Sequence, residues 1–245
     1  MSLNLTIDQG NTVAKMALWD GTGLVDIVNE PHLCAQTVEQ FTSGRGAIDA
    51  AIYCSVSDDG RAVLESIKHI AKRVCRLSSR CRLPIKIDYG TPGTLGADRI
   101  AAAVGAVSLH PDQNLLVVDA GTAVTYDFVT ADGTFRGGNI TPGLKMRLDA
   151  LHRYTARLPQ LEVPASIDHQ RVLGKDTADA MILGAVYGIV GAVSFYMSKL
   201  RDTRVVMTGG NAPLLSPLLD FEVDVDEHLV SKGLNRILLY NEDKK

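Results

Sequence analysis

Two short turns, 111 residues apart, carry residue types that could bind phosphate groups. Asp8-Gln9-Gly10-Asn11-Thr12 follows one apolar run, and Asp119-Ala120-Gly121-Thr122-Ala123 follows another. Glycine lets backbone N–H groups approach a phosphate because it has no Cβ, and the Asn11 and Thr12 side chains can donate hydrogen bonds to its oxygens. Lys15 adds a positive charge shortly after the first turn. This chemistry suits the phosphates of a nucleotide.

The sequence around these turns is repeated, and the repetition favours phosphate binding. Each turn leads into a second β-prone run, at 13–19 and 124–130, and Asp-Gly follows each run, at 20–21 and 132–133. Asp-Gly between β-prone runs is a strong hairpin signal. One such turn alone would be explained as well by an ordinary hairpin, with Asp and Gly present for backbone reasons. Two equivalent turns predict loops that face each other across a cleft and hold the β- and γ-phosphates of ATP.

The elements that must position these turns alternate between strands and helices. The pattern predicts strands at 51–56, 85–88, 138–140, 204–208 and 222–225, and helices at 59–75, 96–109, 143–154, 176–200, 212–219 and 228–239. Such alternation is typical of α/β layers with a largely parallel centre. Asp176 and Thr177 are favourable N-cap residues for the longest helix. We therefore expect an α/β fold of two halves, 1–114 and 115–245, each a mixed sheet flanked by helices.

A third group of residues, Gly96-Ala97-Asp98-Arg99, opens an alanine-rich predicted helix. A carboxylate there is favoured by the helix dipole, so an N-terminal helix charge beside a surface arginine would explain it. The alternative is a carboxylate base beside a guanidinium that holds a polar substrate, as phosphoryl transfer to an alcohol requires. Thr208-Gly209-Gly210 lies between a strand and a helix, where open α/β sheets bind ligands, and a plain strand-to-helix turn is the other explanation.

Composition and missing motifs exclude several classes of protein. A formal net charge of −3 gives no electrostatic footprint for nucleic acid, and the four cysteines show no CxxC spacing for zinc. The sequence contains neither GxxxxGK[ST] nor GxGxxG, so P-loop and Rossmann nucleotide sites are not supported. Free thiols without a secretory signal predict a cytoplasmic location.

An uncharged run from Ala180 to Ser198 is long enough to suggest a membrane span. It is rich in glycine and alanine, and no basic cluster flanks it. Gly184, Gly188 and Gly191 share one helix face, where another backbone could approach closely. These features favour a buried or dimer-interface helix, and we expect no membrane contact.

In sequence order, these motifs resemble those of the type III pantothenate kinases, which belong to the acetate and sugar kinase, Hsp70 and actin superfamily. The resemblance extends from about residue 5 to residue 234 and implies a duplicated ribonuclease H-like, actin-like ATPase fold. Its motifs are Asp8-x-Gly10-Asn11-Thr12-x-x-Lys15, Tyr89, Leu95-Gly96-Ala97-Asp98-Arg99, Asp119-x-Gly121-Thr122-Ala123, Gly138-x-Ile140-x-Pro142-Gly143, Leu173-Gly174-x-Asp176-Thr177 and Thr208-Gly209-Gly210.

The resemblance also implies a role for each of these residues. Asp98 would take the proton from the primary hydroxyl of pantothenate in the first step of coenzyme A biosynthesis. Asp119 would hold a monovalent cation, K⁺ or NH₄⁺, which the family requires with Mg²⁺, and the enzyme would be a homodimer. ATP would be bound by Asp8, Gly10, Asn11, Thr12, Lys15, Gly121, Thr122, Gly209 and Gly210, and pantothenate by Tyr89, Gly96, Ala97, Asp98, Arg99 and Thr177.

Three other functions fit parts of this pattern. A regulatory protein of the same fold without turnover would keep the phosphate turns, but Asp98, Arg99 and Asp119 argue against it. A filament-forming actin-like protein usually carries large insertions, for which 245 residues leave no room. A sugar or acetate kinase would share the Asp-x-Gly turns but would not be expected to show Tyr89 with the 96–99 run.

Overall fold

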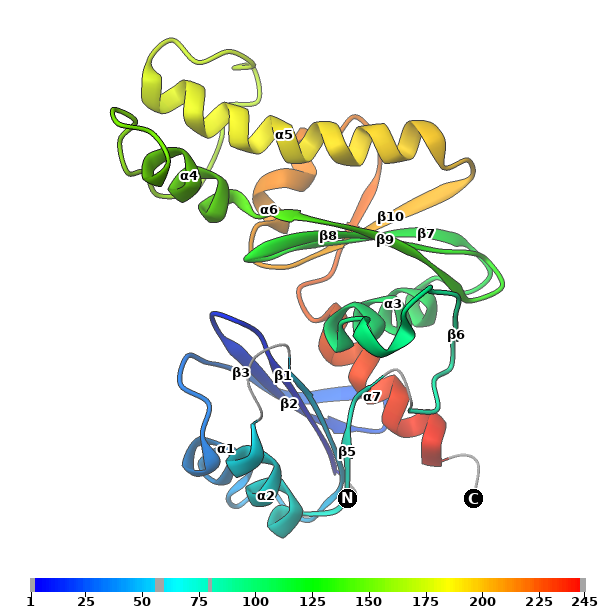
Figure 1. Ribbon diagram of the computed structural model, residues 1–245. Helices are drawn as coiled ribbons and strands as arrows, with labels where there is room; N and C mark the ends of the chain where they lie inside the picture. Colours follow the sequence, from blue (N-terminus) through cyan, green and yellow to red (C-terminus); the bar gives the residue numbers. More distant parts are fainter. Residues whose placement is uncertain (1–2, 56–59, 79–80, 243–245) are drawn as a thin grey trace. The chain divides into compact units, whose positions relative to one another are not determined.

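The computed structural model describes residues 3–55, 60–78 and 81–242. These residues form two compact units. Figure 1 shows the chain coloured from its N-terminus to its C-terminus. The first contains the described residues up to Asp112, with 132–136 and those from His228 onward, and the second contains 113–131 and 137–227. The sequence repeat places the boundary between the halves near Asn114 and leaves the C-terminal helix in the second half. In the structure that helix packs in the first unit.

The strands of the first unit form one mixed sheet with the order β3-β2-β1-β4-β5. The central strand β1 pairs antiparallel with β2 and parallel with β4; β3 is antiparallel to β2, and β5 is parallel to β4. Because β1 and β4 are central, their side chains are buried on both faces, which explains their nearly continuous apolar sequences. The strands are β1 (Leu3–Gln9), β2 (Ala14–Asp20), β3 (Gly23–Glu30), β4 (Ile48–Ser55) and β5 (Ala71–Arg76).

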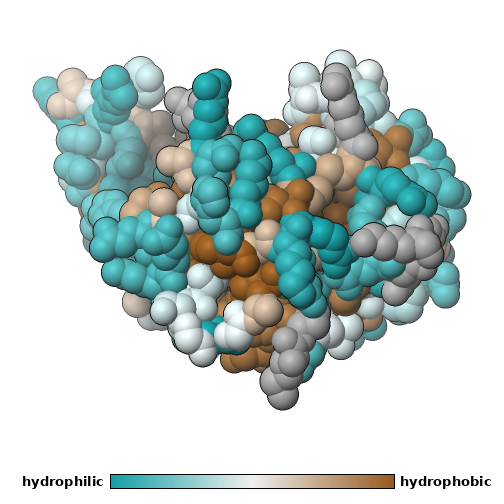
Figure 2. Space-filling model, turned by 90° about the horizontal axis from the view of Figure 1, so that it is seen from below, coloured by the Kyte–Doolittle hydropathy of each residue, from teal (hydrophilic) through white to brown (hydrophobic). Residues whose placement is uncertain are grey.

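One face of this sheet is covered by helices α1 (Ala35–Thr42) and α2 (Arg61–Ile70). Both are amphipathic, and Val38 and Ile67 bury their side chains in the core that contains Leu5 and Ile7. The opposite sides of the two helices face water. Seen from below the view of Figure 1, the surface is mostly hydrophilic, with a smaller hydrophobic area between polar side chains (Figure 2).

The first unit also contains two helices that come from distant parts of the sequence, α3 (Ala97–Leu109) and α7 (Leu229–Glu242). Their backbones pass so close that a Cβ on Gly233 would lie 1.8 Å from the Ala101 carbonyl oxygen, and a Cβ on Gly105 would lie 2.4 Å from that of Leu229. The helices can approach this closely only because glycine occupies both positions.

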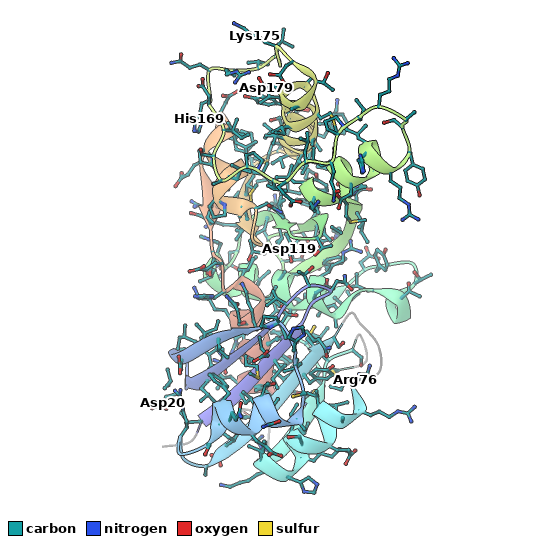
Figure 3. The ribbon with its side chains drawn as sticks, turned by 90° about the vertical axis from the view of Figure 1, so that its left-hand side faces the viewer. Asp20, Arg76, Asp119, His169, Lys175 and Asp179 are labelled. Carbon is teal, nitrogen blue, oxygen red and sulfur yellow. The ribbon has the colours of Figure 1, made fainter. Side chains whose placement is uncertain are left out.

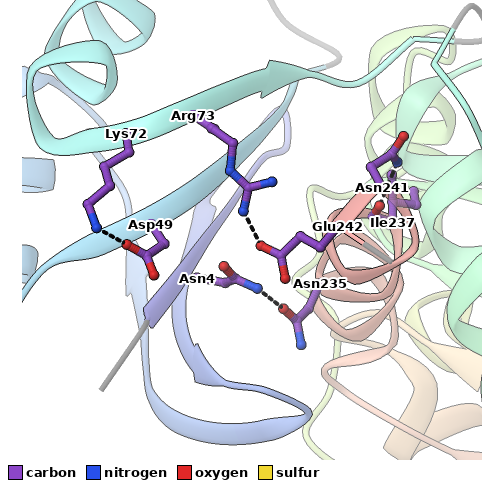
Figure 4. A network of polar contacts seen from close by, with 8 residues as sticks. All are labelled: Asn4, Asp49, Lys72, Arg73, Asn235, Ile237, Asn241 and Glu242. Carbon is purple, nitrogen blue, oxygen red and sulfur yellow. Dashed lines mark hydrogen bonds and ion pairs between the residues drawn. The ribbon is translucent and has the colours of Figure 1, made fainter. Parts of the chain in front are cut away.

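Buried and exposed polar contacts attach α7 to the first sheet (Figure 4). The Asn4 side chain donates to Asn235 Oδ1 at 3.3 Å, and Asn235 Nδ2 donates to the Gly21 carbonyl at 2.8 Å. Further along the helix, Glu242 forms an ion pair with Arg73 of β5. These contacts satisfy buried amide groups, so α7 is an integral part of the first unit.

The second unit repeats the strand order of the first, with β9-β8-β7-β10-β11 in place of β3-β2-β1-β4-β5. As in the first unit, the central strand pairs antiparallel with the next strand of its hairpin and parallel with a later strand. The short strand β6 (Lys86–Ile87) pairs with Thr134 and Phe135, which also belong to the first unit. The strands of the repeat are β7 (Asn114–Ala120), β8 (Ala123–Val129), β9 (Thr134–Pro142), β10 (Thr203–Thr208) and β11 (Val223–Val225).

The repeated strand order confirms the duplicated α/β fold predicted from the sequence. Strands β1 and β7 are related by the predicted offset of 111 residues over their whole length. The predicted Asp-Gly turns are also present: Gly21 directly follows β2 and Gly133 directly precedes β9, with φ angles of 56° and 73°. Such angles favour glycine.

Helices α4 (Leu144–Arg153), α5 (Thr177–Lys199) and α6 (Ala212–Leu215) belong to the second unit, and the short 3₁₀ helix η2 (Ser216–Leu218) follows α6. Of the helices in the described part of the chain, α5 is the one long and apolar enough to cross a membrane. One side of α5 packs against the second sheet, where Ile189 and Val193 are fully buried with Val118 and Met207. This side forms part of a protein core, as predicted.

The structure corrects one predicted helix. Residues 71–75 were expected to continue the helix of 59–75, but they form the edge strand β5, which pairs with β4. Alanine, lysine and arginine are good helix formers, so local propensity favours a helix here, whereas pairing with β4 satisfies the backbone and lets Val74 pack against the core. Val56 and Asp59, at the ends of two predicted elements, lie outside the described residues.

The crossing of α3 and α7 makes Gly233 sensitive to the smallest side chain. We expect Gly233→Ala to lower the free energy of unfolding by about 3 kcal/mol, because the methyl group overlaps the Ala101 backbone. Guanidinium denaturation measures this change. Gly93→Ala is the control, because its methyl group would meet no atom within 4 Å. Equal stability of the two variants would contradict the close crossing.

Candidate active site

The first Asp-x-Gly turn connects β1 to β2 and leaves its polar side chains exposed. The Gly10 N–H donates to the Val13 carbonyl at 3.2 Å and closes the turn, while Asn11 and Thr12 point away from the core. Asp8 and Lys15 are register partners on the two strands, so their positions flank the base of the turn. The turn therefore presents donors and a positive charge beside a carboxylate.

A cavity of about 120 Å³ lies against this turn. Its lining is mainly polar, and it is small, which suits a phosphate group better than a nucleoside. A Cβ on Gly10 would lie 3.1 Å from the Val13 carbonyl oxygen, so a larger residue would strain the turn. The lining residues are Gln9, Gly10, Asn11, Thr12, Val13, Ala14, Glu30, Pro31 and Leu33.

The carboxylates of Asp8 and Asp98 both act on one buried thiol, that of Cys54, a residue that the sequence did not indicate. Cys54 is the register partner of Asp8 on β4, and its thiol is fully buried. Burial raises the pKa of the Cys54 thiol well above its usual value, and the carboxylates of Asp8 and Asp98 raise it further. Cys54 is therefore a protonated thiol at neutral pH, and its hydrogen bond with Asp8 orients that side chain.

Asp98 lies in the first turn of α3, where the helix dipole favours a negative charge. Its Oδ1 accepts a hydrogen bond from the Arg99 N–H at 2.8 Å. A Cβ on Gly96 would lie only 2.4 Å from that oxygen, so glycine at this position leaves room for the carboxylate. Asp98 is half-buried, and it combines a fixed orientation with access from outside.

Arg99, the next residue, is 5% exposed and packs against two aromatic rings. Its guanidinium carbon is 5.8 Å from the centre of the Tyr89 ring and 5.7 Å from that of Phe135. The two rings also contact each other edge to face, with their centres 6.1 Å apart. The predicted substrate residues Tyr89 and Arg99 are thus in contact, joined by cation–π interactions and by Phe135, which the sequence did not indicate.

The second Asp-x-Gly turn is tightly packed within the second unit. Asp119, labelled in Figure 3, lies near the end of β7 and is the register partner of Thr208 on β10. A Cβ on Gly209 would lie 2.5 Å from Asp119 Oδ1, and Gly209 also has a φ angle of 89°. Only glycine fits this position, so Asp119 and the Thr208-Gly209-Gly210 motif form one site.

Two further segments complete the surroundings of this turn. The Gly143 N–H donates to the Thr122 carbonyl at 3.0 Å, and a Cβ on Gly143 would lie 2.4 Å from the carbonyl oxygens of Gly121 and Thr122. On the other side, the Asn211 N–H donates to the Ala120 carbonyl at 3.0 Å. The structure thus brings three of the sequence motifs together. Asn211 directly follows Gly210 and could have been found from that position.

Thr177 is the first residue of α5 and is exposed. The preceding Asp176 is the predicted N-cap, and its Oδ1 accepts from the Asp179 N–H at 2.9 Å. Asp179 also forms an ion pair with Arg171, and Figure 3 shows Asp179 at the beginning of α5 near Lys175 and His169. The helix start is therefore fixed, and the position of Thr177 is fixed with it.

No cluster of three or more His, Cys, Asp or Glu side chains occurs in the part of the chain that the structure describes. Mg²⁺ at phosphoryl-transfer sites is usually bound by one or two carboxylates together with substrate phosphates. Asp8 and Asp119, each at an Asp-x-Gly turn, are carboxylates of this kind. Each carboxylate, within its own unit, is a suitable ligand for Mg²⁺ that arrives with a nucleotide.

The chain is similar in sequence to one known family of proteins and in fold to several solved structures. The profile of the type III pantothenate kinase family matches residues 4–199. A type III pantothenate kinase of Bacteroides fragilis is 39% identical over 243 residues, which cover 98% of each chain.

Two solved structures share the fold. A Campylobacter jejuni protein assigned to the Baf family of transcriptional activators has 23% identity and a TM-score of 0.65, over 98% of this chain and 99% of its own. A ROK hexokinase of Thermus thermophilus has 15% identity and a TM-score of 0.54, over 99% and 100% of the two chains. These likenesses show that the chain shares its duplicated α/β fold with both proteins. The family match and the Bacteroides fragilis relative show that this chain belongs to the type III pantothenate kinase family.

Proposed function

We propose that this chain transfers the γ-phosphoryl group of ATP to the primary hydroxyl of pantothenate and forms 4'-phosphopantothenate, with Asp98 as the general base. Membership of the type III pantothenate kinase family supports the reaction. The observation that carries the role of Asp98 is its place in the first turn of α3, where its carboxylate is half-buried and accepts a hydrogen bond from the Arg99 N–H. A reaction in the cytoplasm is part of the proposal.

The proposed mechanism assigns most of the catalysis to positioning and charge. Asp98 accepts the proton of the attacking hydroxyl, so a nucleophilic oxygen develops at the moment of transfer. Backbone N–H groups of the Gly10 turn, the Asn11 and Thr12 side chains and Lys15 bind phosphate oxygens as their negative charge shifts. Mg²⁺ bound with ATP neutralises charge on the phosphates. Gly121, Thr122, Gly209 and Gly210 contribute the nucleotide contacts of the second unit.

Pantothenate carries a carboxylate, and Arg99 is the residue that suits it. A guanidinium that is mostly shielded from water attracts a carboxylate more strongly than an exposed one does. Tyr89 supports Arg99 from one side, and the Gly96–Ala97 backbone lies next to the reacting carboxylate. Thr177 supplies a hydroxyl from the start of α5. These residues form the proposed pantothenate site.

Asp119 is the proposed ligand of a monovalent cation, K⁺ or NH₄⁺. The carbonyl groups of the turn after Asp119 are oxygen donors of the kind that such cations bind. Gly209 and Gly143 hold this turn so closely that its oxygens keep a fixed arrangement. A cation there would reduce the repulsion between Asp119 and the phosphates of ATP.

A second copy of the chain is the proposed partner. The second unit exposes large apolar side chains, including Ile140, Tyr154 and Leu173, which are 61%, 80% and 81% exposed. A largely apolar cavity of about 470 Å³ lies among Pro142, Arg147, Ala150, Leu151, Tyr154, Thr155, Gly184 and Ala185. Apolar surface of this kind is typical of protein interfaces, and the glycine side of α5 borders it.

The first functional prediction concerns the proposed base. Asp98→Asn should leave the fold intact and lower the rate of pantothenate-dependent ADP formation by about 10²-fold or more, because the amide cannot accept the proton. A coupled assay with ATP, Mg²⁺ and pantothenate measures the rate. Asp20→Asn is the control, because Asp20 is exposed at the far end of β2 from the first turn. Near-normal turnover of Asp98→Asn would move the role of base to another carboxylate, with Asp8 the first choice.

The cation proposal is tested through Asp119. We expect wild-type activity to rise when K⁺ replaces Na⁺, and Asp119→Asn to raise the half-saturating K⁺ concentration by about 10-fold or more. Titration of the rate with KCl at constant ionic strength measures this shift. Asp220→Asn, on an exposed part of the second unit, is the matched control. An unchanged K⁺ response in Asp119→Asn would place the cation elsewhere.

The partner proposal predicts a sedimenting species with twice the mass of one chain. Gly184→Glu should give single chains, because the added carboxylate would be buried at the interface. The substitution should be tolerated within one chain, since a Cβ on Gly184 meets no atom within 4 Å. Ser43→Glu, at the exposed end of α1, should leave the assembly unchanged. A wild-type protein that sediments as a single chain would contradict the proposal.

A further inference from the structure

Two cysteines of the first unit lie close enough to react with each other. The Sγ atoms of Cys75 and Cys81 are 3.7 Å apart. Cys75 is near the end of β5, where it is the register partner of Ile52. After Arg76 the chain leaves the sheet, and the Cys81 N–H donates to the Ser78 carbonyl at 3.0 Å, which returns Cys81 toward the strand. Residues 79 and 80 lie outside the described residues.

We propose that Cys75 and Cys81 are an oxidisable dithiol that closes to a reversible intramolecular disulfide when the protein meets a peroxide. A disulfide requires an S–S distance of about 2.05 Å, roughly 1.7 Å less than the present separation. Both side chains are half-buried, so neither is fully enclosed by core atoms. Rotation of the two cysteine side chains can supply the change, because Cys81 is not held in the sheet.

The surroundings assign different roles to the two sulfur atoms. A hydrogen bond from the Cys75 thiol lowers the pKa of Cys81, and the hydroxyl and backbone N–H of Ser78 lower it further. The same hydrogen bond raises the pKa of Cys75, as does its burial. Cys81 is therefore the thiolate that attacks, and Cys75 is the thiol that resolves the product.

The reaction takes place in two balanced steps. The Cys81 thiolate attacks one oxygen of hydrogen peroxide, the O–O bond breaks, and Cys81 sulfenic acid and hydroxide form. The Cys75 sulfur then attacks the Cys81 sulfur, the S–O bond breaks, and its oxygen leaves as water with the Cys75 proton. Two thiols are oxidised, and the peroxide is reduced to hydroxide and water. A dithiol such as dithiothreitol reverses the change by exchange.

The other two cysteines differ from this pair. Cys54 is fully buried and its pKa is raised well above the usual value, so it is a poor nucleophile. Cys34 is exposed before α1, and its oxidation would join separate molecules or stop at the sulfenic acid. An intramolecular disulfide at Cys75 and Cys81 is thus distinguishable from oxidation elsewhere.

Residues near Cys75 and Cys81 are hydrogen-bonded to two other elements of the first unit. The N–H of Leu77 donates to the Tyr53 carbonyl at 2.9 Å, and Tyr53 immediately precedes Cys54 on β4. Asn241 of α7 donates to the Arg82 carbonyl at 3.1 Å. A disulfide would therefore close a loop whose two ends are hydrogen-bonded to β4 and to α7.

Peptide mapping of the full-length protein tests the proposal. After brief treatment with hydrogen peroxide and alkylation of the remaining thiols, trypsin should release Val74-Cys75-Arg76 joined to Cys81-Arg82, two hydrogen atoms lighter than the separate peptides. The protein should lose two titratable thiols per chain and regain both with dithiothreitol. The Cys34→Ser control should give the same linked peptides, because Cys34 takes no part.

Single substitutions test which cysteine attacks the peroxide and which one then forms the disulfide. Cys75→Ser should accumulate sulfenic acid at Cys81, which dimedone traps, whereas Cys81→Ser should leave Cys75 reduced under the same treatment. Peptide mapping uses the wild-type protein alone, so the disulfide can be tested even if one of these variants does not fold. The proposal would be overturned if both thiols survived treatment that oxidises Cys34, or if the pair were oxidised without becoming linked. Neither outcome depends on the kinase activity.

Discussion

The close approach of backbone segments around Asp119 is the constraint that organises the second unit. The Gly209 backbone lies against the Asp119 carboxylate, and the Gly143 backbone lies against the carbonyl oxygens of the turn that follows. A Cβ at Gly209 or Gly143 would lie 2.5 or 2.4 Å from these atoms, and Cβ contacts this short do not occur in relaxed structures. Because β7 and β10 are parallel, they end at the same edge of the sheet, and that edge presents Asp119 with the turn oxygens.

The two units share one strand order, but the residues around their Asp-x-Gly turns differ. Asp8 has Cys54 as its partner on the parallel strand, and at the equivalent register Asp119 has Thr208. The first turn spans four residues between β1 and β2, whereas the second spans two residues between β7 and β8. The longer turn exposes Asn11 and Thr12 and is followed by Lys15, which is suited to phosphate oxygens. The shorter turn is enclosed by neighbouring backbone, which is suited to a fixed set of oxygen ligands.

The sequence predicted what depends on local pattern and missed what depends on distant pairing. The β1 and β7 repeat, the Asp-Gly hairpins and the Asp176 N-cap follow from short stretches, and all are present. The strand character of 71–75 comes from pairing with β4, which no local signal reveals. The sequence did not indicate Cys54 or Phe135, because each matters only through its contact with a candidate site residue from a distant part of the chain. The packing of α7 in the first unit depends on Gly105 and Gly233, which are far apart in the chain.

Asp98 and Arg99 show how one helix turn can give adjacent residues opposite environments. Successive residues on a helix point about 100° apart, so Asp98 stays accessible while Arg99 packs against both Tyr89 and Phe135. These contacts keep the guanidinium largely out of water, so its charge is screened less than at an exposed site. The aromatic pair therefore fixes the guanidinium beside the first turn of α3 and leaves the Asp98 carboxylate accessible.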